Sequence, residues 1–226
     1  MSATNYLRRR NEIEEYFDRT AADAWARLTS DEPLTGVRAT VRAGRDEMRS
    51  TLLSWLPEDL TGLSMLDAGC GAGQLAIEAA ARGAKVTAVD LSKSLIDLAA
   101  ERSALLSLKG QVEFHVGDML KPTGAPFDYV VCMDSVIHYD LPDFESTLFQ
   151  LIALSRRACL FTFAPSTPLL SLMHTVGKLF PRGDRSPAIK PHGERAVRRV
   201  LCQHDIVESE RVKSGFYISH AMKVSV

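Results

Sequence analysis

Residues 66–73 read LDAGCGAG, and this stretch gives the clearest indication of the fold class. The apolar run SMLDA leads into it, and QLAIEAAARG, which has helical spacing, follows it. Gly69, Gly71 and Gly73 allow a tight turn and the close approach of a ligand, while the amino end of the following helix presents unpaired N–H groups. The stretch therefore predicts a strand, a ligand-binding turn and a helix. Its alternative interpretation is a tight loop without a ligand.

The same alternation of strands and helices continues along the chain. The runs KVTAVD, VEFHVGD, FDYVVCMDS and ACLFTFAP are apolar at most positions, as in strands covered on both faces. Helical patterns separate most of them, and DIVESERV and FYISHAMKVS are expected to close the sheet as an antiparallel pair. We predict an α/β fold with a doubly wound, mostly parallel seven-stranded sheet.

Two regions lie outside this alternation. Apolar residues at helical spacing between positions 13 and 56 predict an N-terminal helical cap over residues 1–60, followed by a sheet domain over residues 61–226. After Pro165 the pattern lapses into an amphipathic run and then a segment rich in proline, glycine and charge. We expect residues 166–192 to form a lid, because they follow the fifth strand beside the carboxyl ends of the sheet.

Composition narrows the class of protein. The 226 residues are 46% hydrophobic and 24% charged, as in soluble globular proteins and unlike disordered chains. A net charge of −1 argues against nucleic acid as a partner. No apolar run is long enough to span a bilayer, no secretory signal is recognisable, and the four scattered cysteines suit a reducing compartment. We expect a cytoplasmic protein.

Acidic residues lie at or near the ends of the first three predicted strands. Asp67 precedes the first glycine of the turn by two positions, where the pyrophosphate of a dinucleotide would be repelled, so the spacing suits a cationic ligand. Asp90 comes 23 residues later and is placed either to accept hydrogen bonds from ribose hydroxyls or to cap the next helix. Asp118 either reaches an adenine amine, with Met119 packed on the ring, or is a plain turn residue.

These motifs, between residues 66 and 165, resemble the class I S-adenosylmethionine-dependent methyltransferases. The resemblance implies S-adenosylmethionine as the cofactor and S-adenosylhomocysteine as its product. It places Asp67 and Gly69 near the methionine end, Asp90 on the ribose, and the turn containing Met133 over the sulfonium. The cofactor-binding residues predicted in this way are Arg42, Asp67, Gly69, Gly71, Asp90, Leu91, Asp118, Met119 and Met133.

Arg42 belongs to an arginine stripe on the second helical run. The stripe consists of Arg38, Arg42, Arg45 and Arg49, spaced so that all lie along one side of a helix. Such a stripe is normally a solvated face, and the neighbouring acidic residues favour that interpretation. By its place in VRAGR, Arg42 is the candidate to bind the cofactor's carboxylate bidentately.

Three further stretches lie partly or wholly outside the cofactor motifs: EYFDRTAADAW, VCMDSVIHYDLPD and FAPSTPLLSLMHTVGKLFPRGDRSP with the following PHGE. They resemble the magnesium-protoporphyrin IX O-methyltransferases of chlorophyll and bacteriochlorophyll biosynthesis. The resemblance implies methyl transfer to a propionate carboxylate of Mg-protoporphyrin IX, giving the monomethyl ester. Magnesium is then part of the substrate, with no metal bound by the protein itself. The resemblance also implies contact with magnesium chelatase and peripheral association with the inner or photosynthetic membrane.

The acceptor's acidity limits the catalytic machinery that is needed. A propionate has a pKa near ~4–5 and is already ionised at pH 7, so it needs positioning rather than a general base. His138, just beyond the fourth strand, either orients the propionate or contacts the macrocycle's metal, or else it is satisfied by neighbouring backbone. Tyr16 either folds over the cofactor or is a core aromatic. His138 and Tyr16 are the catalytic candidates.

A rival acceptor is a quinol or another small phenol. With a pKa near ~10, a phenol would require a base or a metal, and His138 would be that base. Binding of Mg-protoporphyrin would separate the two acceptors.

Overall fold

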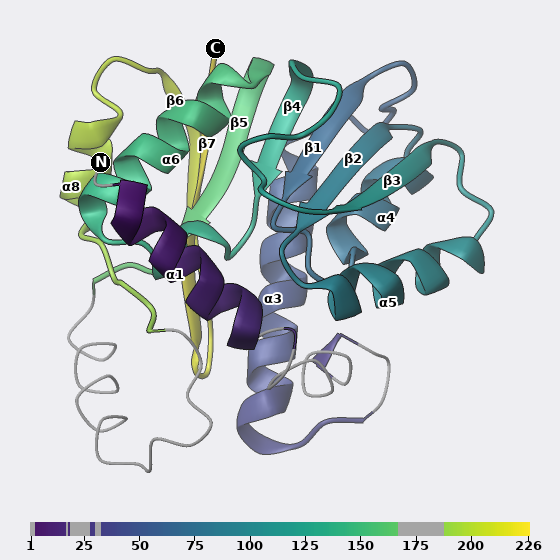
Figure 1. The fold of residues 1–226 in the computed structure, drawn as a ribbon, viewed down its shortest axis with the longest axis horizontal. Helices are drawn as coiled ribbons and strands as arrows, with labels where there is room; N and C mark the ends of the chain where they lie inside the picture. The colour runs from purple at the N-terminus through teal and green to yellow at the C-terminus, as the bar shows by residue number, and fades with distance from the viewer. Residues whose placement is uncertain (1–2, 17, 19–27, 30–32, 167–187) are drawn as a thin grey trace.

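The structure is a computed structural model that describes residues 3–16, 18, 28–29, 33–166 and 188–226. Its centre is a seven-stranded sheet in the order β3-β2-β1-β4-β5-β7-β6 (Figure 1). The first five strands pair in parallel, and β7 lies antiparallel between β5 and β6. The predicted seven-stranded, doubly wound fold is confirmed. The strands are β1 (Ser64–Ala68), β2 (Lys85–Asp90), β3 (Gln111–Val116), β4 (Phe127–Cys132), β5 (Ser155–Phe163), β6 (Ile206–Ser214) and β7 (Tyr217–Ser225).

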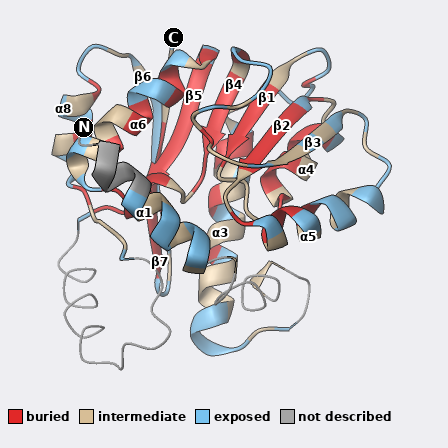
Figure 2. Cartoon of the chain, viewed as in Figure 1, coloured by how far each residue is buried: buried red, intermediate tan, exposed pale blue. Residues whose placement is uncertain are grey.

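Helices cover both faces of the sheet, which is why its central strands are almost wholly buried (Figure 2). α3 and α4 share one hydrophobic core with the sheet, and α6 and α8 share the other. α5 packs against β2 and β3, and Ser92 caps it by accepting a hydrogen bond from Leu95 N at 3.3 Å. The helices are α1 (Ala3–Glu15), α3 (Gly36–Ser54), α4 (Gln74–Ala81), α5 (Lys93–Ala104), the short 3₁₀ helix η2 (Val136–His138), α6 (Leu141–Ala153) and α8 (Glu194–Val200).

α3 is part of the sheet's covering layer. Its Met48, Leu52 and Leu53 are fully buried and belong to the same core as Met65 of β1 and Leu160 of β5. Burial of three large side chains stabilises the contact by roughly 1.5–3 kcal/mol each. α3 therefore holds its position relative to the strand ends, which matters for the site. The division into a cap over residues 1–60 and a domain over residues 61–226 stays a prediction.

The two flanks of the predicted lid meet beside η2. Pro165 and His192 form a bridge, with Ser166 N donating to His192 O and His192 N donating to Ala164 O, each at 2.9 Å. The ring of His192 lies 3.0 Å from the carbonyl oxygen of Tyr139, and Lys190 N donates to Ile137 O at 2.7 Å. These bonds fix the η2 turn. Residues 167–187 lie outside the described part of the chain, so the lid stays a prediction.

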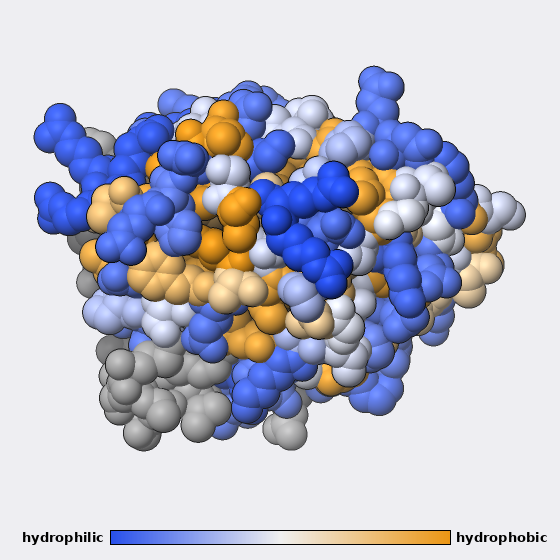
Figure 3. Space-filling view, turned by 90° about the horizontal axis from the view of Figure 1, so that it is seen from above, coloured by the Kyte–Doolittle hydropathy of each residue, from blue (hydrophilic) through white to orange (hydrophobic). Residues whose placement is uncertain are grey.

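The opposite end of the molecule, where the parallel strands begin, is largely hydrophilic with smaller apolar patches (Figure 3). Exposed ion pairs stand there, such as Lys109 with Asp59 at 2.9 Å and Arg157 with Asp128 at 3.2 Å. No helix within the described residues is both long and apolar enough to cross a membrane.

Candidate active site

A cavity of about 360 Å³ lies at the carboxyl ends of the parallel strands. Its walls come from the turns after β1, β2, β3 and β4, from α1 and α3, and from the β6–β7 hairpin. This is where open α/β sheets bind ligands. The predicted residues that line it are Tyr16, Asp67, Gly69, Gly71, Asp90, Leu91, Asp118, Met119, Met133 and His138.

The glycine-rich turn is narrow on one side and open on the other. Gly69 and Gly71 have φ angles of 78° and 54°, which favour glycine. Gly69 N donates to Val89 O at 2.8 Å, and a Cβ at Gly69 would collide with the Ser135 side chain. A Cβ at Gly71 would meet no atom of the described residues within 4 Å. The turn is therefore held closely to β2 and η2 while leaving open space beside Gly71.

Two buried carboxylates stand at this turn. Asp67 is 2% exposed, and its Oδ2 has no hydrogen-bond partner among the described residues. Burial, reinforced by the nearby charge of Asp90, raises the pKa of Asp67 to about 7. Burial also raises the pKa of Asp90, although its carboxylate accepts hydrogen bonds from Gly71 N at 2.8 Å and Ser92 N at 2.9 Å. Neither carboxylate forms an ion pair with a described residue. The arrangement suits a ligand that brings its own positive charge.

The residues predicted at the adenine lie at the next strand end. Asp118 follows β3; its Oδ1 accepts a hydrogen bond from Leu120 N at 3.0 Å, and its Oδ2 lies 3.5 Å from Arg10 Nη1 of α1. Met119 is buried and lines the cavity, as does Met133 after β4. Asp118 is thus both a turn residue and a cavity residue, and α1 is joined to the site through it.

The arginine stripe meets the cavity at a different position from the one predicted. Arg42 is absent from the cavity wall among the described residues, and its Nε donates to Leu28 O at 2.9 Å. Arg45 and Arg49 line the cavity instead. Arg49 pairs with Asp46 and Glu78, and Arg45 with Asp134. The helical spacing placed these arginines on one side correctly, but which of them reaches the cavity depends on how α3 packs.

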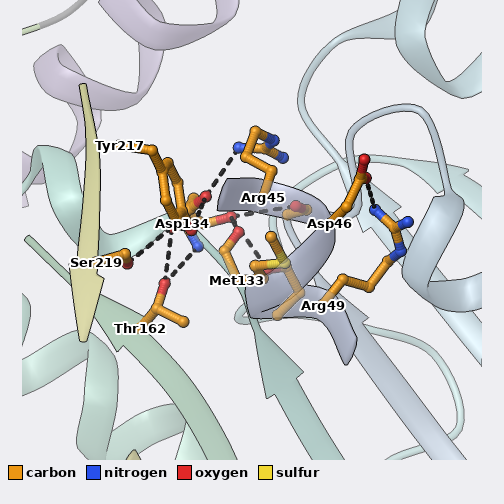
Figure 4. A network of polar contacts seen from close by, with 11 residues as sticks. Arg45, Asp46, Arg49, Met133, Asp134, Thr162, Tyr217 and Ser219 are labelled. Atoms are coloured by element: carbon orange, nitrogen blue, oxygen red, sulfur yellow. Dashed lines mark hydrogen bonds and ion pairs between the residues drawn. The ribbon is translucent and has the colours of Figure 1, made fainter. Parts of the chain in front are cut away.

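Asp134 is a site residue that sequence reasoning missed. It follows β4 with φ 55°, is 7% exposed at its side chain, and lines the cavity. Its carboxylate accepts hydrogen bonds from four side chains: Arg45 Nη1 at 2.8 Å, Tyr217 Oη at 3.0 Å, Thr162 Oγ1 at 3.0 Å and Ser219 Oγ at 3.2 Å (Figure 4). These partners come from α3, β5 and β7. The available signal was an aspartate shortly after a strand: Asp134 lies two residues beyond β4, as Asp118 lies two residues beyond β3.

His138 and Tyr16, the catalytic candidates, line the same cavity. His138 ends η2 and is buried, whereas Tyr16 follows α1 and is half-buried. Ser135 Oγ lies 3.2 Å from the carbonyl oxygens of both Ala68 and Gly69, which joins the η2 segment to the glycine-rich turn. The structure brings both candidates to the site, while their catalytic roles stay predictions.

Comparison with known proteins places this cavity in a family. Residues 65–157 match the family described as methyltransferase domain, and residues 132–225 match magnesium-protoporphyrin IX methyltransferase C-terminus. The magnesium-protoporphyrin O-methyltransferase of Rhodobacter capsulatus is 48% identical over 221 residues, which cover 97% of this chain and 98% of that protein. The chain belongs to the magnesium-protoporphyrin O-methyltransferase family.

One solved structure has a similar fold over nearly the whole length of this chain. The crystal structure of magnesium protoporphyrin IX methyltransferase from Synechocystis PCC 6803 with bound SAH has a TM-score of 0.85 and 28% identity, and the match covers 95% of this chain and 98% of that one. The similarity to a quinone-pathway enzyme is more limited. A ubiquinone biosynthesis O-methyltransferase of Xylella fastidiosa is 40% identical over 87 residues, which are 37% of this chain and 34% of that protein.

Proposed function

We propose that this family member transfers the methyl group of S-adenosylmethionine to a propionate carboxylate of Mg-protoporphyrin IX, giving the monomethyl ester and S-adenosylhomocysteine. Two buried carboxylates, those of Asp67 and Asp90, lie beside an open glycine-rich turn and support binding of the cofactor in this cavity. Asp67 Oδ2 is buried and has no hydrogen-bond partner in the part of the chain that the structure describes, and a cationic ligand would satisfy it. Family membership supports the acceptor half.

Each cofactor-binding residue has a specific task in this proposal. The turn at Gly69 and Gly71 holds the methionine end close to the backbone, next to Asp67. Asp90, oriented by the N–H groups of Gly71 and Ser92, accepts hydrogen bonds from the ribose hydroxyls. Asp118 and Met119 hold the adenine. When bound, the cofactor supplies an electrophilic methyl group on a sulfonium.

The acceptor needs orientation rather than deprotonation. A propionate is ionised at neutral pH, so the enzyme's task is to hold one carboxylate oxygen in line with the methyl group. Positioning of this kind contributes roughly 7–11 kcal/mol to lowering a barrier. His138 donates a hydrogen bond to the propionate from its fixed place in η2. Tyr16 approaches from α1, and its helix helps to exclude water.

Further proposals concern where the enzyme works and rest on the family resemblance. We propose that the enzyme is cytoplasmic, that it receives its poorly soluble porphyrin from magnesium chelatase, and that it associates peripherally with the inner or photosynthetic membrane. Direct hand-over would keep the apolar macrocycle out of water.

Labelled S-adenosylmethionine and Mg-protoporphyrin, incubated with the purified protein and followed by mass analysis of the porphyrin, test the activity. We expect one labelled methyl group per porphyrin, released by mild ester hydrolysis. A simple quinol-type phenol, run in parallel, is the comparison acceptor. Methylation of the phenol without methylation of the porphyrin would replace this proposal with the phenol alternative.

A further inference from the structure

We infer that Phe216, at the tip of the β6–β7 hairpin, forms the surface on which the acceptor's flat macrocycle lies. This inference rests on the proposed function, since it assumes that the acceptor is a porphyrin. It assigns to the hairpin, far along the chain from every cofactor motif, a role in selecting the substrate.

Phe216 lines the cavity and is also exposed to solvent. Its side chain is 52% exposed and belongs to the cavity wall. Val41, Ile189 and Ile218 line the cavity as well, so the phenylalanine extends an apolar surface. An exposed aromatic residue at the opening of a ligand cavity gives a planar, apolar ligand a place to stack.

The sheet order places Phe216 on the acceptor's side. Asp90 ends β2 and Asp118 follows β3 at one edge of the sheet, and the proposed function assigns them to ribose and adenine. The hairpin joins β6 and β7, which lie at the other edge beyond β4 and β5. His138 follows β4, between the two groups. A ligand that extends from His138 away from the adenine therefore runs toward the hairpin.

The hairpin is fixed, so Phe216 is held in place. A Cβ at Gly44 of α3 would lie 2.5 Å from Cδ1 of Tyr217, and one at Gly215 would lie 2.6 Å from the side chain of Thr40. Gly215 also has φ 55°. These contacts require glycine on both sides of the helix–hairpin interface. Tyr217, the neighbour of Phe216, is in turn hydrogen-bonded to Asp134.

Affinity for the porphyrin, measured apart from affinity for the cofactor, tests this assignment. Full-length wild type, Phe216→Ala, Phe216→Trp and the control Phe149→Ala are titrated with Mg-protoporphyrin by fluorescence and with S-adenosylhomocysteine by calorimetry. Phe149 is a suitable control because it is 38% exposed on α6 and is not among the residues that line the cavity.

We expect Phe216→Ala to weaken porphyrin binding by about tenfold, because a stacked ring and its buried area are both lost. Phe216→Trp keeps a flat ring and should stay within about twofold of wild type. Phe149→Ala should bind porphyrin like wild type. All four proteins should bind S-adenosylhomocysteine equally.

Three results would overturn the inference alone, given a wild type that methylates Mg-protoporphyrin. They are wild-type porphyrin affinity in Phe216→Ala, equal losses in the alanine and tryptophan variants, and a parallel loss of S-adenosylhomocysteine affinity. A wild type that neither binds nor methylates the porphyrin would overturn the proposed function, and this inference with it.

Discussion

The two halves of the cavity are built in different ways. The half at β1, β2 and β3 is assembled at the strand ends: Asp67 lies near the end of β1, Asp90 ends β2 and Asp118 follows β3. Asp90 and Asp118 accept hydrogen bonds from backbone N–H groups. The half at β4 and β7 converges on Asp134 from three separate elements. The first half can be recognised as a sequence motif, whereas the second forms only when α3, β5 and β7 have come together around Asp134.

Their electrostatics differ as well. The carboxylates of Asp67 and Asp90 have no described cation beside them, so this half is complete only with a positively charged ligand. Asp134 already has Arg45 at 2.8 Å and hydroxyl donors around it. An anionic propionate would be repelled by the first pair and tolerated beside the second. The difference matches a cation donor and an anion acceptor sharing one cavity.

Removal of Asp90 should break the cofactor half while leaving the acceptor half intact. We expect Asp90→Ala to weaken cofactor binding by about 2–4 kcal/mol, because two ribose hydroxyls lose a charged acceptor. Calorimetric titration measures this loss, with Asp97→Ala on the exposed face of α5 as the control. Unchanged affinity in a folded Asp90→Ala protein would remove this residue from the site.

Asp134→Asn tests the other half. Asparagine tolerates a positive φ, so the backbone should keep its conformation while Arg45 loses its counter-charge. We expect about 1–3 kcal/mol of lost unfolding free energy and a raised KM for the porphyrin, with cofactor affinity nearly unchanged. Denaturant unfolding and both titrations check this. A selective loss of cofactor affinity would show that the two halves are not separate.

His138 lies between the halves, and its variants separate orientation from base catalysis. If it only orients the propionate, His138→Gln should keep part of the hydrogen bond and cost about 1–2 kcal/mol in kcat, with His138→Ala costing more. Since the acceptor is ionised throughout pH 6–9, the wild-type rate should show no rising acid limb. Equal and severe losses in both variants, together with such a limb, would indicate a base and favour a phenol acceptor.

The raised pKa of Asp67 predicts a pH effect confined to the cofactor half. Below its pKa of about 7 the free carboxyl is protonated, and a cationic ligand must displace that proton. S-adenosylmethionine affinity should therefore fall by about tenfold from pH 8 to pH 6, while remaining nearly flat above pH 8. Asp67→Asn should bind more weakly and lose this dependence. A flat wild-type profile would mean that Asp67 does not meet the ligand's charge.

Site residues at the predicted strand ends could be found from the sequence, whereas residues whose partners come from distant strands could not. Strand–helix alternation was sufficient for the seven-stranded sheet. Asp67, Gly69 and Asp90 could be placed at the cavity because each belongs to or adjoins a strand end that the sequence pattern predicts. Their roles toward the cofactor stay predictions. Asp134 was missed because Thr162, Tyr217 and Ser219 come from distant strands. Spacing predicts the side of a helix on which the arginines lie, whereas the packing of α3 decides that Arg45, and not Arg42, lines the cavity. The predicted contact of Arg42 with the cofactor's carboxylate stays a prediction.

The place of β7 in the sheet affects the order in which the parts of the cavity are made during translation. Tyr217 and Ser219, which bind Asp134, lie within β7, which follows the other six described strands along the chain although it pairs between β5 and β6. At translation rates of ~5–20 residues per second, roughly 5–20 seconds separate Asp118 from Tyr217. A nascent chain thus carries all the strand-end carboxylates of the cofactor half well before the hairpin wall emerges.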